Sequence, residues 1–398
     1  MKSKKPTKKN DATEVKSKSF STTTVDPYEA GIEIGEALRE IQPEVILLFT
    51  SIHYDFSELF EAIYSILGTR EVVIFGGTGD GIYETGRVSS HGIAGLGING
   101  GGKIHWPLAV RTDAHQDPFR CAQECARELL SKSKESIAAA FVFADLTCDG
   151  VKVVEGVASV LKAPFIGGLT GDDWQFKKGF IFANGEVYQN AVGILGMSGE
   201  FSFAMNSASG WKPMGKTGIV EESHGNVIGY IGGKKAVDFI EEQFGMPPAE
   251  AALGVISLAV YETEQFEHFF LRTSREFNLE SGEITCFGSI NTGSPVRLCN
   301  ATEDDVLAGV NEALAGTGEL GFVPAFAVVI SCGERKWLLR DRVSEETNRL
   351  FDTLGKKIPL VGFSSFGEIG PFRRKDGSFT TVFFHNVSYV VLLIGPTK

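Results

Sequence analysis

The chain has 398 residues and a net charge of −12, and 43% of its residues are hydrophobic. This length and composition are typical of a soluble globular protein with two or three domains and a substantial core. The acidic charge argues against nucleic-acid binding, because it would repel phosphates, and no apolar run approaches the roughly 20 residues that a membrane-spanning helix needs.

The first 24 residues are rich in lysine, serine and threonine and contain almost no apolar side chain. We predict that they form a disordered basic tail, because such a composition cannot bury apolar surface. The tail lacks the apolar segment of a secretory signal. A helix is predicted directly after it, over residues 26–41, because Asp26 can cap the first turn and Pro27 suits the first helical position.

Two similar strand–helix–strand stretches follow. In the first, residues 45–51 predict a buried strand, 56–67 an amphipathic helix and 72–75 a second strand, which ends on Gly76-Gly77. The second stretch has the same order of elements over residues 138–168 and ends on another pair of glycines. Glycine-punctuated strands come after both. The matching order of elements and glycine positions predicts an internal duplication.

A third stretch of this kind lies near the C terminus, with a strand over residues 325–331, a helix over 345–354 and a glycine-containing turn over 359–370. The strand–helix–strand steps imply parallel pairing through right-handed crossovers, and the later strands add antiparallel pairing. We therefore predict an α/β fold: repeated β-α-β units followed by antiparallel meanders, forming mixed sheets with helices packed on their faces, in two lobes.

The six cysteines form no CxxC pair, so neither a zinc ribbon nor a disulfide framework is indicated. Cys121 and Cys125 share one face of a predicted helix, but no histidine or further thiol lies at a useful spacing, so we interpret them as packing residues. We expect a reduced, cytoplasmic protein without a bound metal or cofactor.

Several short motifs together resemble a known family. GGLTGDDW at residues 167–174 and the segments at 182–199 and 209–215 resemble the FIST N-terminal domain, named for F-box and intracellular signal transduction proteins. SCGERKW at 331–337 and GFSSFGEIGP at 362–371 resemble its C-terminal companion. The resemblance implies an N-terminal domain with two internal repeats and a C-terminal domain. We place them at residues 25–220 and 221–398.

The resemblance also implies a function. FIST domains are thought to act as sensory modules that bind small ligands of the amino-acid type. They are often attached to signalling outputs such as kinases or chemoreceptors. No output domain is recognisable in this chain, so the expectation is a sensor that binds a small ligand and passes the signal to a separate partner.

The glycine turns are the candidate ligand site. A strand that ends on glycine lets another group approach the backbone closely. Amides in the second turn could receive a carboxylate, while an adjacent acid receives an ammonium group. The alternative is that these acids accept backbone N–H groups within the turn. The candidate binding residues are Gly167, Gly168, Gly171, Asp172, Asp173, Ser364, Ser365 and Glu368, with Asp80 as the matching acid of the first repeat.

A hydrolase or transferase is the alternative function, with Cys332 or the Asp172, Asp173 and Glu368 carboxylates as reacting groups. Cys332 would need a nearby base, which His385 supplies only if the fold brings them together; otherwise it is a core cysteine. His385 and Asn386 end an apolar strand, where polar residues are usually structural. Arg335 could bind a ligand carboxylate or pair with Glu345 or Glu346. P-loop, HExxH and GxSxG motifs are absent from the sequence.

Overall fold

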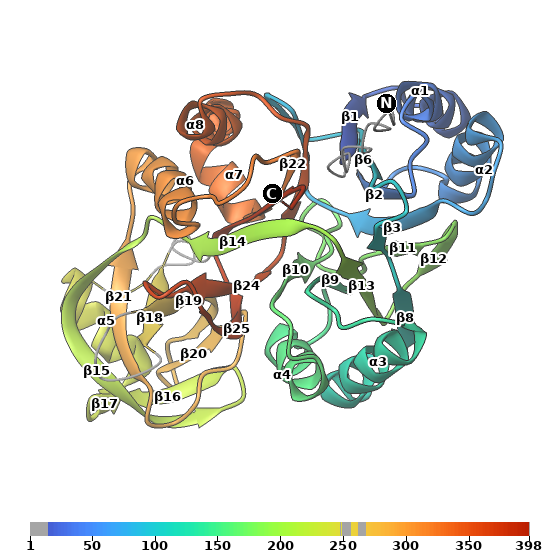
Figure 1. The fold of residues 1–398 in the computed structure, drawn as a ribbon. Coiled ribbons are helices and arrows are strands. Elements are labelled where there is room, and N and C mark those ends of the chain that lie inside the picture. The colour runs from blue at the N-terminus through green and yellow to red at the C-terminus, as the bar shows by residue number, and fades with distance from the viewer. Residues whose placement is uncertain (1–14, 247, 249–255, 262–267, 398) are drawn as a thin grey trace, which may run out of the picture.

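The computed structural model describes residues 15–246, 248, 256–261 and 268–397, and contains four β-sheets with helices packed on them (Figure 1). Three of the sheets are built by three structural units with a common order of elements. Each unit runs strand, helix, strand, helix, strand, hairpin, strand. The sequence therefore correctly predicted a mixed α/β fold with repeated β-α-β units.

The first unit comprises β1 (Lys16–Thr22), α1 (Pro27–Arg39), β2 (Val45–Thr50), α2 (Phe56–Leu67), β3 (Val73–Thr78), β4 (Ile82–Glu84), β5 (Arg87–Ser89) and β6 (Ile93–Asn99). The Asp26 side chain caps α1 by accepting the N–H of Glu29, 2.8 Å away, as predicted. The strand β1 pairs antiparallel with β6 along its whole length.

The second unit comprises β7 (Ile104–His105), β8 (Leu108–Thr112), α3 (Pro118–Lys132), β9 (Ala139–Ala144), α4 (Gly150–Val160), β10 (Phe165–Leu169), β11 (Ile181–Ala183), β12 (Glu186–Tyr188) and β13 (Ala191–Gly199). Here β8 takes the place that β1 has in the first unit, because it pairs with β13 at the sheet edge.

The third unit comprises β14 (Ser202–Ala208), α6 (Glu303–Gly316), β22 (Phe326–Cys332), α7 (Gly333–Leu339), a 3-10 turn (Arg340–Arg342), α8 (Glu345–Leu354), β23 (Leu360–Ser365), β24 (Glu368–Arg373), β25 (Phe379–His385) and β26 (Tyr389–Gly395). It is interrupted between β14 and α6 by a long insertion, which forms the fourth sheet. That inserted sheet contains β15 (Lys212–His224), β16 (Val227–Ile231), β17 (Lys234–Lys235), β18 (Ser257–Tyr261), β19 (Phe269–Asn278), β20 (Glu283–Cys286) and β21 (Pro295–Asn300), with α5 (Ala236–Phe244) beside it.

The three units exchange hairpins. In each unit the two strands of the β-α-β step pair parallel, as β2–β3, β9–β10 and β22–β23. The outer edge of each parallel pair is then covered by the hairpin of another unit. The hairpin β11–β12 joins β3, β24–β25 joins β10, and β4–β5 joins β23. The sheets are consequently closed in a cycle around one centre.

A ring of backbone hydrogen bonds marks this centre. The donor lies just beyond β3, β10 or β23, and the acceptor lies at the end of the corresponding strand in another unit. The three bonds run from Asp80 N to Ser364 O (2.9 Å), from Gly171 N to Thr78 O (2.8 Å) and from Phe366 N to Leu169 O (3.2 Å). The three glycine turns that the sequence singled out therefore meet.

The faces of the three sheets that point toward the centre share one apolar core. Phe49 of β2 stacks on Phe363 of β23 with ring centroids 4.7 Å apart, and Phe143 of β9 contacts both rings edge-on at 5.5 Å. The outer faces are covered by helix pairs, α1 with α2 and α3 with α4 on the first two sheets, and α6 with α8 on the third (Figure 1).

The structure differs from the sequence prediction at two expected divisions of the chain. The prediction of a disordered tail over residues 1–24 fails for residues 16–22, which form β1, because backbone pairing with β6 does not require apolar side chains. Residues 1–14 lie outside the described part of the chain. The boundary expected at residues 220–221 falls inside β15. No helix in the described part of the chain is long and apolar enough to cross a membrane.

Candidate functional site

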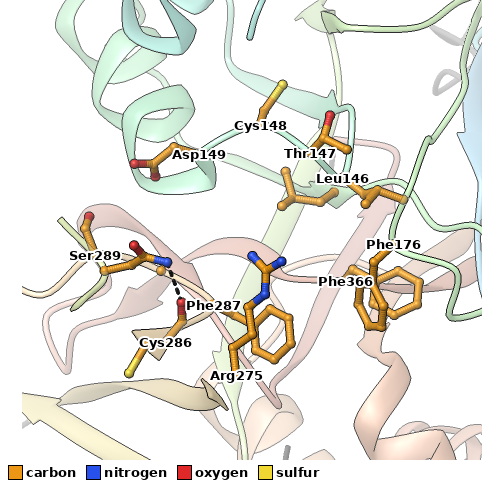
Figure 2. Close-up of a pocket in the computed structure, with 13 residues that line it drawn as sticks. Leu146, Thr147, Cys148, Asp149, Phe176, Arg275, Cys286, Phe287, Ser289 and Phe366 are labelled. Atoms are coloured by element: carbon orange, nitrogen blue, oxygen red, sulfur yellow. Dashed lines mark hydrogen bonds between the residues drawn. The ribbon is translucent and has the colours of Figure 1, made fainter. Parts of the chain in front are cut away.

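A cavity of about 400 Å³ lies beside the central ring, between the second unit and the inserted sheet (Figure 2). One side is formed by the residues that link β9 to α4, from Leu146 to Asp149. The opposite side comes from the inserted sheet. The end of the cavity nearest the centre is closed by Phe176 and by Phe366, which follows β23. We call this cavity the central pocket.

Arg275 of β19 provides the positive charge of the central pocket. Its guanidinium extends from the inserted sheet toward the α4 side of the pocket, as Figure 2 shows. Its side chain is exposed, and no described carboxylate forms an ion pair with it. An unpaired guanidinium in a concave site is suited to a carboxylate or phosphate, which it can bind through two parallel hydrogen bonds.

The N-terminus of α4 contributes further polar groups. Asp149 caps this helix, since its Oδ1 accepts the N–H groups of Val151 (2.9 Å) and Lys152 (3.3 Å). No described donor is hydrogen-bonded to the second carboxylate oxygen, Oδ2. The helix end brings a partial positive charge to the pocket, and Asp149 brings one carboxylate oxygen that can accept a hydrogen bond.

Three phenylalanines form an aromatic wall. Phe176 lies between the other two: its ring stacks on Phe287 with centroids 5.9 Å apart and meets Phe366 edge-on at 4.8 Å. Phe287 follows β20 of the inserted sheet, Phe176 belongs to the second unit and Phe366 to the third. A pocket with one cation and an aromatic wall suits a small anion that also carries apolar surface.

The loop after β10, residues 171–178, carries Phe176 and is held by Asp172. This buried carboxylate accepts the backbone N–H groups of Phe176 (2.8 Å), Lys177 (2.7 Å) and Lys178 (3.1 Å). Asp173, Trp174 and Phe176 have positive φ angles between 52° and 62°, which are uncommon outside glycine. Asp172 thus acts as a turn anchor, the alternative considered from the sequence, and holds a strained loop in place.

Asp173 and Asp80 are not among the residues that line the central pocket. The Oδ2 of Asp173 is 2.5 Å from Nε2 of His53. The Oδ2 of Asp80 accepts a hydrogen bond from Nε1 of Trp174 at 2.7 Å and lies 3.4 Å from the Lys336 ammonium. Burial raises the pKa of Asp80, an effect that Lys336 and Trp174 oppose.

The three candidate glycines serve the backbone. Gly167 and Gly168 lie within β10, between β9 and β24. A Cβ at Gly167 would be 1.7 Å from the carbonyl oxygen of Val142, so no other residue fits there. The amide of Gly171 donates to Thr78 in the central ring. None of the three is among the residues that line the central pocket.

The candidate residues of the third unit are buried inside it. Glu368 is fully buried; its Oε1 accepts a hydrogen bond from Ser365 Oγ (2.7 Å), and its Oε2 accepts from the amide and hydroxyl of Ser388 (both 2.9 Å). Burial raises the pKa of Glu368 to about 7. The Ser364 hydroxyl is buried without a hydrogen-bond partner among the described residues. These residues do not reach the central pocket.

Cys332, His385 and Asn386 are also buried in the protein. Burial, with the neighbouring Glu368, raises the pKa of Cys332 well above its usual value, so its sulfur is a neutral thiol. His385 is hydrogen-bonded through Nε2 to the carbonyl of Gly370 (2.9 Å), and burial lowers its pKa to about 4. Asn386 accepts the amide N–H of Thr273 (3.3 Å).

Arg335 forms the structural ion pair that was one of its two predicted roles. It is fully buried, and its Nη2 lies 2.7 Å from Oε1 of Glu346. The other oxygen of Glu346 accepts hydrogen bonds from the hydroxyls of Tyr83 (2.7 Å) and Ser331 (3.0 Å). Arg335 is therefore unavailable to a ligand in the central pocket.

Sequence reasoning missed the main residues of the central pocket, Arg275, Phe176 and Phe287. Arg275 and Phe287 come from the insertion that forms the fourth sheet, about a hundred residues after the loop that they face, and no motif joins these segments. The only sequence signal was the position of Phe176, two residues after the GDDW motif at residues 171–174.

Comparison with known proteins identifies two domain families in the chain. The FIST N domain matches residues 9–111 and 44–234, and the FIST C domain matches residues 236–371. No curated protein matches the sequence.

Among solved structures, cyanuric acid hydrolase from A. caulinodans resembles the chain at 10% identity, covering 96% of this chain and 100% of that one, with a TM-score of 0.37. PurLQS from Thermotoga maritima matches at 13% identity over 96% of this chain and 72% of that one, with a TM-score of 0.23. PurL from T. maritima complexed with ATP matches at 13% identity over 96% and 71%, with a TM-score of 0.22.

Proposed function

The chain belongs to the FIST family, and from this premise we propose that it is a sensory protein that binds a small carboxylate ligand of the amino-acid type in the central pocket. The observation that carries the proposal is the Arg275 guanidinium, which extends into the pocket without a described carboxylate partner. The family match supports a sensory role, and the pocket supports the chemical class of the ligand.

The two charged groups of the pocket suit a zwitterion. The ligand carboxylate would pair with Arg275, near the positive end of α4. The ligand ammonium would donate to Oδ2 of Asp149, the oxygen that the helix cap leaves unused. The apolar part of the ligand would lie against the wall of Phe176, Phe287 and Phe366. The volume of about 400 Å³ is at the lower end of the usual range for small-ligand pockets, as an amino acid requires.

The position of the pocket suggests how binding is passed on. Its walls come from the second unit, the third unit and the inserted sheet, so a ligand would hold three parts of the chain in one arrangement. A separate output protein, of the kinase or chemoreceptor kind, would then recognise the surface of the liganded form. This follows the general rule that a ligand shifts a protein toward the conformation it binds best.

A thermal-shift screen with amino acids and small organic acids tests the ligand proposal. A ligand at about 100 times its dissociation constant should stabilise the protein by about 2.7 kcal/mol. Arg275→Gln should abolish the shift without changing the stability of the unliganded protein, because the side chain is exposed. Arg127→Gln, on an exposed face of α3, is the matched control and should keep the shift.

Two outcomes would overturn the proposal. The first is a screen in which no compound stabilises the wild-type protein, and the second is a ligand whose effect survives Arg275→Gln. The same samples should be analysed for consumption of each compound, since turnover would favour the alternative function of hydrolase or transferase.

A further inference from the structure

We propose that His53, His91 and Asp173 form a binding site for a divalent transition-metal ion such as Zn²⁺. Each of these residues offers one ligand atom, and the three atoms all lie within 4.8 Å of one another. Two imidazoles and one carboxylate form a donor set that binds zinc and related metals, with open positions left for water. No metal was expected from the sequence, where only the cysteines were considered as ligands; His53, His91 and Asp173 are far apart in the chain.

The fold brings these residues together from three loops. His53 follows β2, His91 precedes β6, and Asp173 belongs to the loop after β10. The first two loops are fixed to each other, because the amide of Ser51 donates to Gly92 O (2.9 Å) and the amide of Gly92 donates to Ser51 Oγ (2.9 Å).

The Asp173 loop is held equally firmly. Asp172 anchors it through three backbone amides, and the Trp174 side chain is hydrogen-bonded to Asp80. Asp173 itself has a φ of 54°, a conformation that costs free energy in a residue other than glycine. Because all three backbone segments are fixed, the site would need only side-chain adjustment to bind a metal.

Side-chain movement would have to bring the three ligand atoms, which lie within 4.8 Å of one another, to the spacing that one metal ion requires. In the structure Nε2 of His53 is 2.5 Å from Oδ2 of Asp173, a direct hydrogen bond. Two ligand atoms that each lie about 2.0–2.1 Å from a tetrahedral metal are roughly 3.3 Å apart. The His53 side chain is 61% exposed, so its ring has room to move by this difference. A metal would lie between Nε2 of His53 and Oδ2 of Asp173 in place of this hydrogen bond, with the imidazole hydrogen on Nδ1.

Isothermal titration of the tag-free, chelator-treated full chain with Zn²⁺ tests the site. We expect one equivalent to bind. His53→Ala, His91→Ala and Asp173→Asn should each weaken binding by at least about 100-fold, since even changes behind a ligand cost 10- to 100-fold. Asparagine is chosen at position 173 because it tolerates a positive φ angle. His224→Ala, at an exposed histidine in the inserted sheet, should leave the affinity unchanged.

The visible absorption of bound Co²⁺ gives an independent readout, because intense bands indicate tetrahedral coordination. These bands should be lost in the same three variants and retained in His224→Ala. The proposal is overturned if wild type and the three variants bind Zn²⁺ equally, or if His224→Ala weakens binding as much as they do. Neither measurement depends on the ligand proposed for the central pocket, so the two proposals can fail separately.

Discussion

Trp174 donates a hydrogen bond from Nε1 to Oδ2 of Asp80, 2.7 Å away, and so joins the loop after β10 to the loop after β3. The indole also meets Phe176 and Phe366 edge-on, with centroids 5.8 and 5.3 Å apart. It therefore lies between the acid of the first unit and the aromatic wall of the central pocket. Its position suggests that it sets the geometry of that wall.

Replacing Trp174 by phenylalanine should remove the hydrogen bond and keep most of the aromatic contact. We expect the free energy of unfolding to fall by about 1.5 kcal/mol, the usual cost of losing a hydrogen bond to a charged group, because the bond is only partly buried. Urea denaturation measures it. Trp337→Phe is the control, because that indole is 56% exposed. An equal loss in both variants would show that the Asp80 bond has no special role.

Replacing Gly167 by alanine should destabilise the protein by about 3 kcal/mol or more, since the new methyl group would overlap the Val142 carbonyl and force β9 and β10 apart. Gly321→Ala is the matched control, because nothing lies within 4 Å of its new Cβ. Thermal unfolding of the two variants makes the comparison. A Gly167→Ala protein as stable as the Gly321→Ala protein would contradict the close strand approach seen here.

Replacing Arg335 by methionine should cost about 3–5 kcal/mol, because it leaves the buried carboxylate of Glu346 without its cation. Arg120→Met removes an exposed ion pair to Glu124 and should cost less than about 1 kcal/mol. Any ligand of the central pocket should still bind the folded fraction of the Arg335→Met protein. Loss of that binding without loss of stability would indicate that Arg335 binds the ligand.

Stability should depend on pH through Glu368. Its pKa is raised from 4.5 to about 7 in the folded state, so the folded protein holds this proton more tightly than the unfolded chain does. The resulting stabilisation is fully present below 4.5 and is lost as the pH rises through 7. A Glu368→Gln protein lacks this effect, and the difference in unfolding free energy between it and wild type should change by roughly 3 kcal/mol across that range.

Chemical denaturation at about pH 5 and about pH 8 measures this difference. His385 acts in the opposite direction, because its lowered pKa of about 4 removes stability as the pH falls. It is present in both proteins, so its effect cancels in the comparison. Glu186→Gln, at an exposed position of β12, provides the control. A constant difference between wild type and Glu368→Gln across the range would rule out the raised pKa.

The sequence predicted the repeated units well, because each depends on local signals. Apolar runs such as residues 45–50 form strands buried on both faces, and Asp26 and Asp55 cap the helices that begin after them. The exchange of hairpins between units could not be predicted from the sequence, since nothing in a short hairpin such as β11–β12 specifies which sheet edge it covers. The insertion separates β14 from the rest of the third unit, so the sequence did not indicate that β14 is the first strand of that unit.

The glycine turns illustrate why the site was harder to predict than the fold. Paired glycines correctly indicated a close approach to the backbone, but the approaching groups are the carbonyls of neighbouring strands, Leu48 O at Gly76 and Val142 O at Gly167. A glycine shows that space is needed without showing what occupies it. Likewise, two adjacent aspartates have different roles: Asp172 binds its own loop and Asp173 contacts His53.

The exchanged hairpins determine whether the two halves of the chain can occur separately in natural proteins. A fragment that ended before α6 would leave β10 without β24 and would leave β4 without β23, so two sheet edges would be open to solvent and to pairing with other copies. The N-terminal and C-terminal halves therefore depend on each other, and neither half is expected to fold stably as a separate domain. Natural gene fusions should accordingly join other proteins to the ends of this pair and leave the junction between its halves intact.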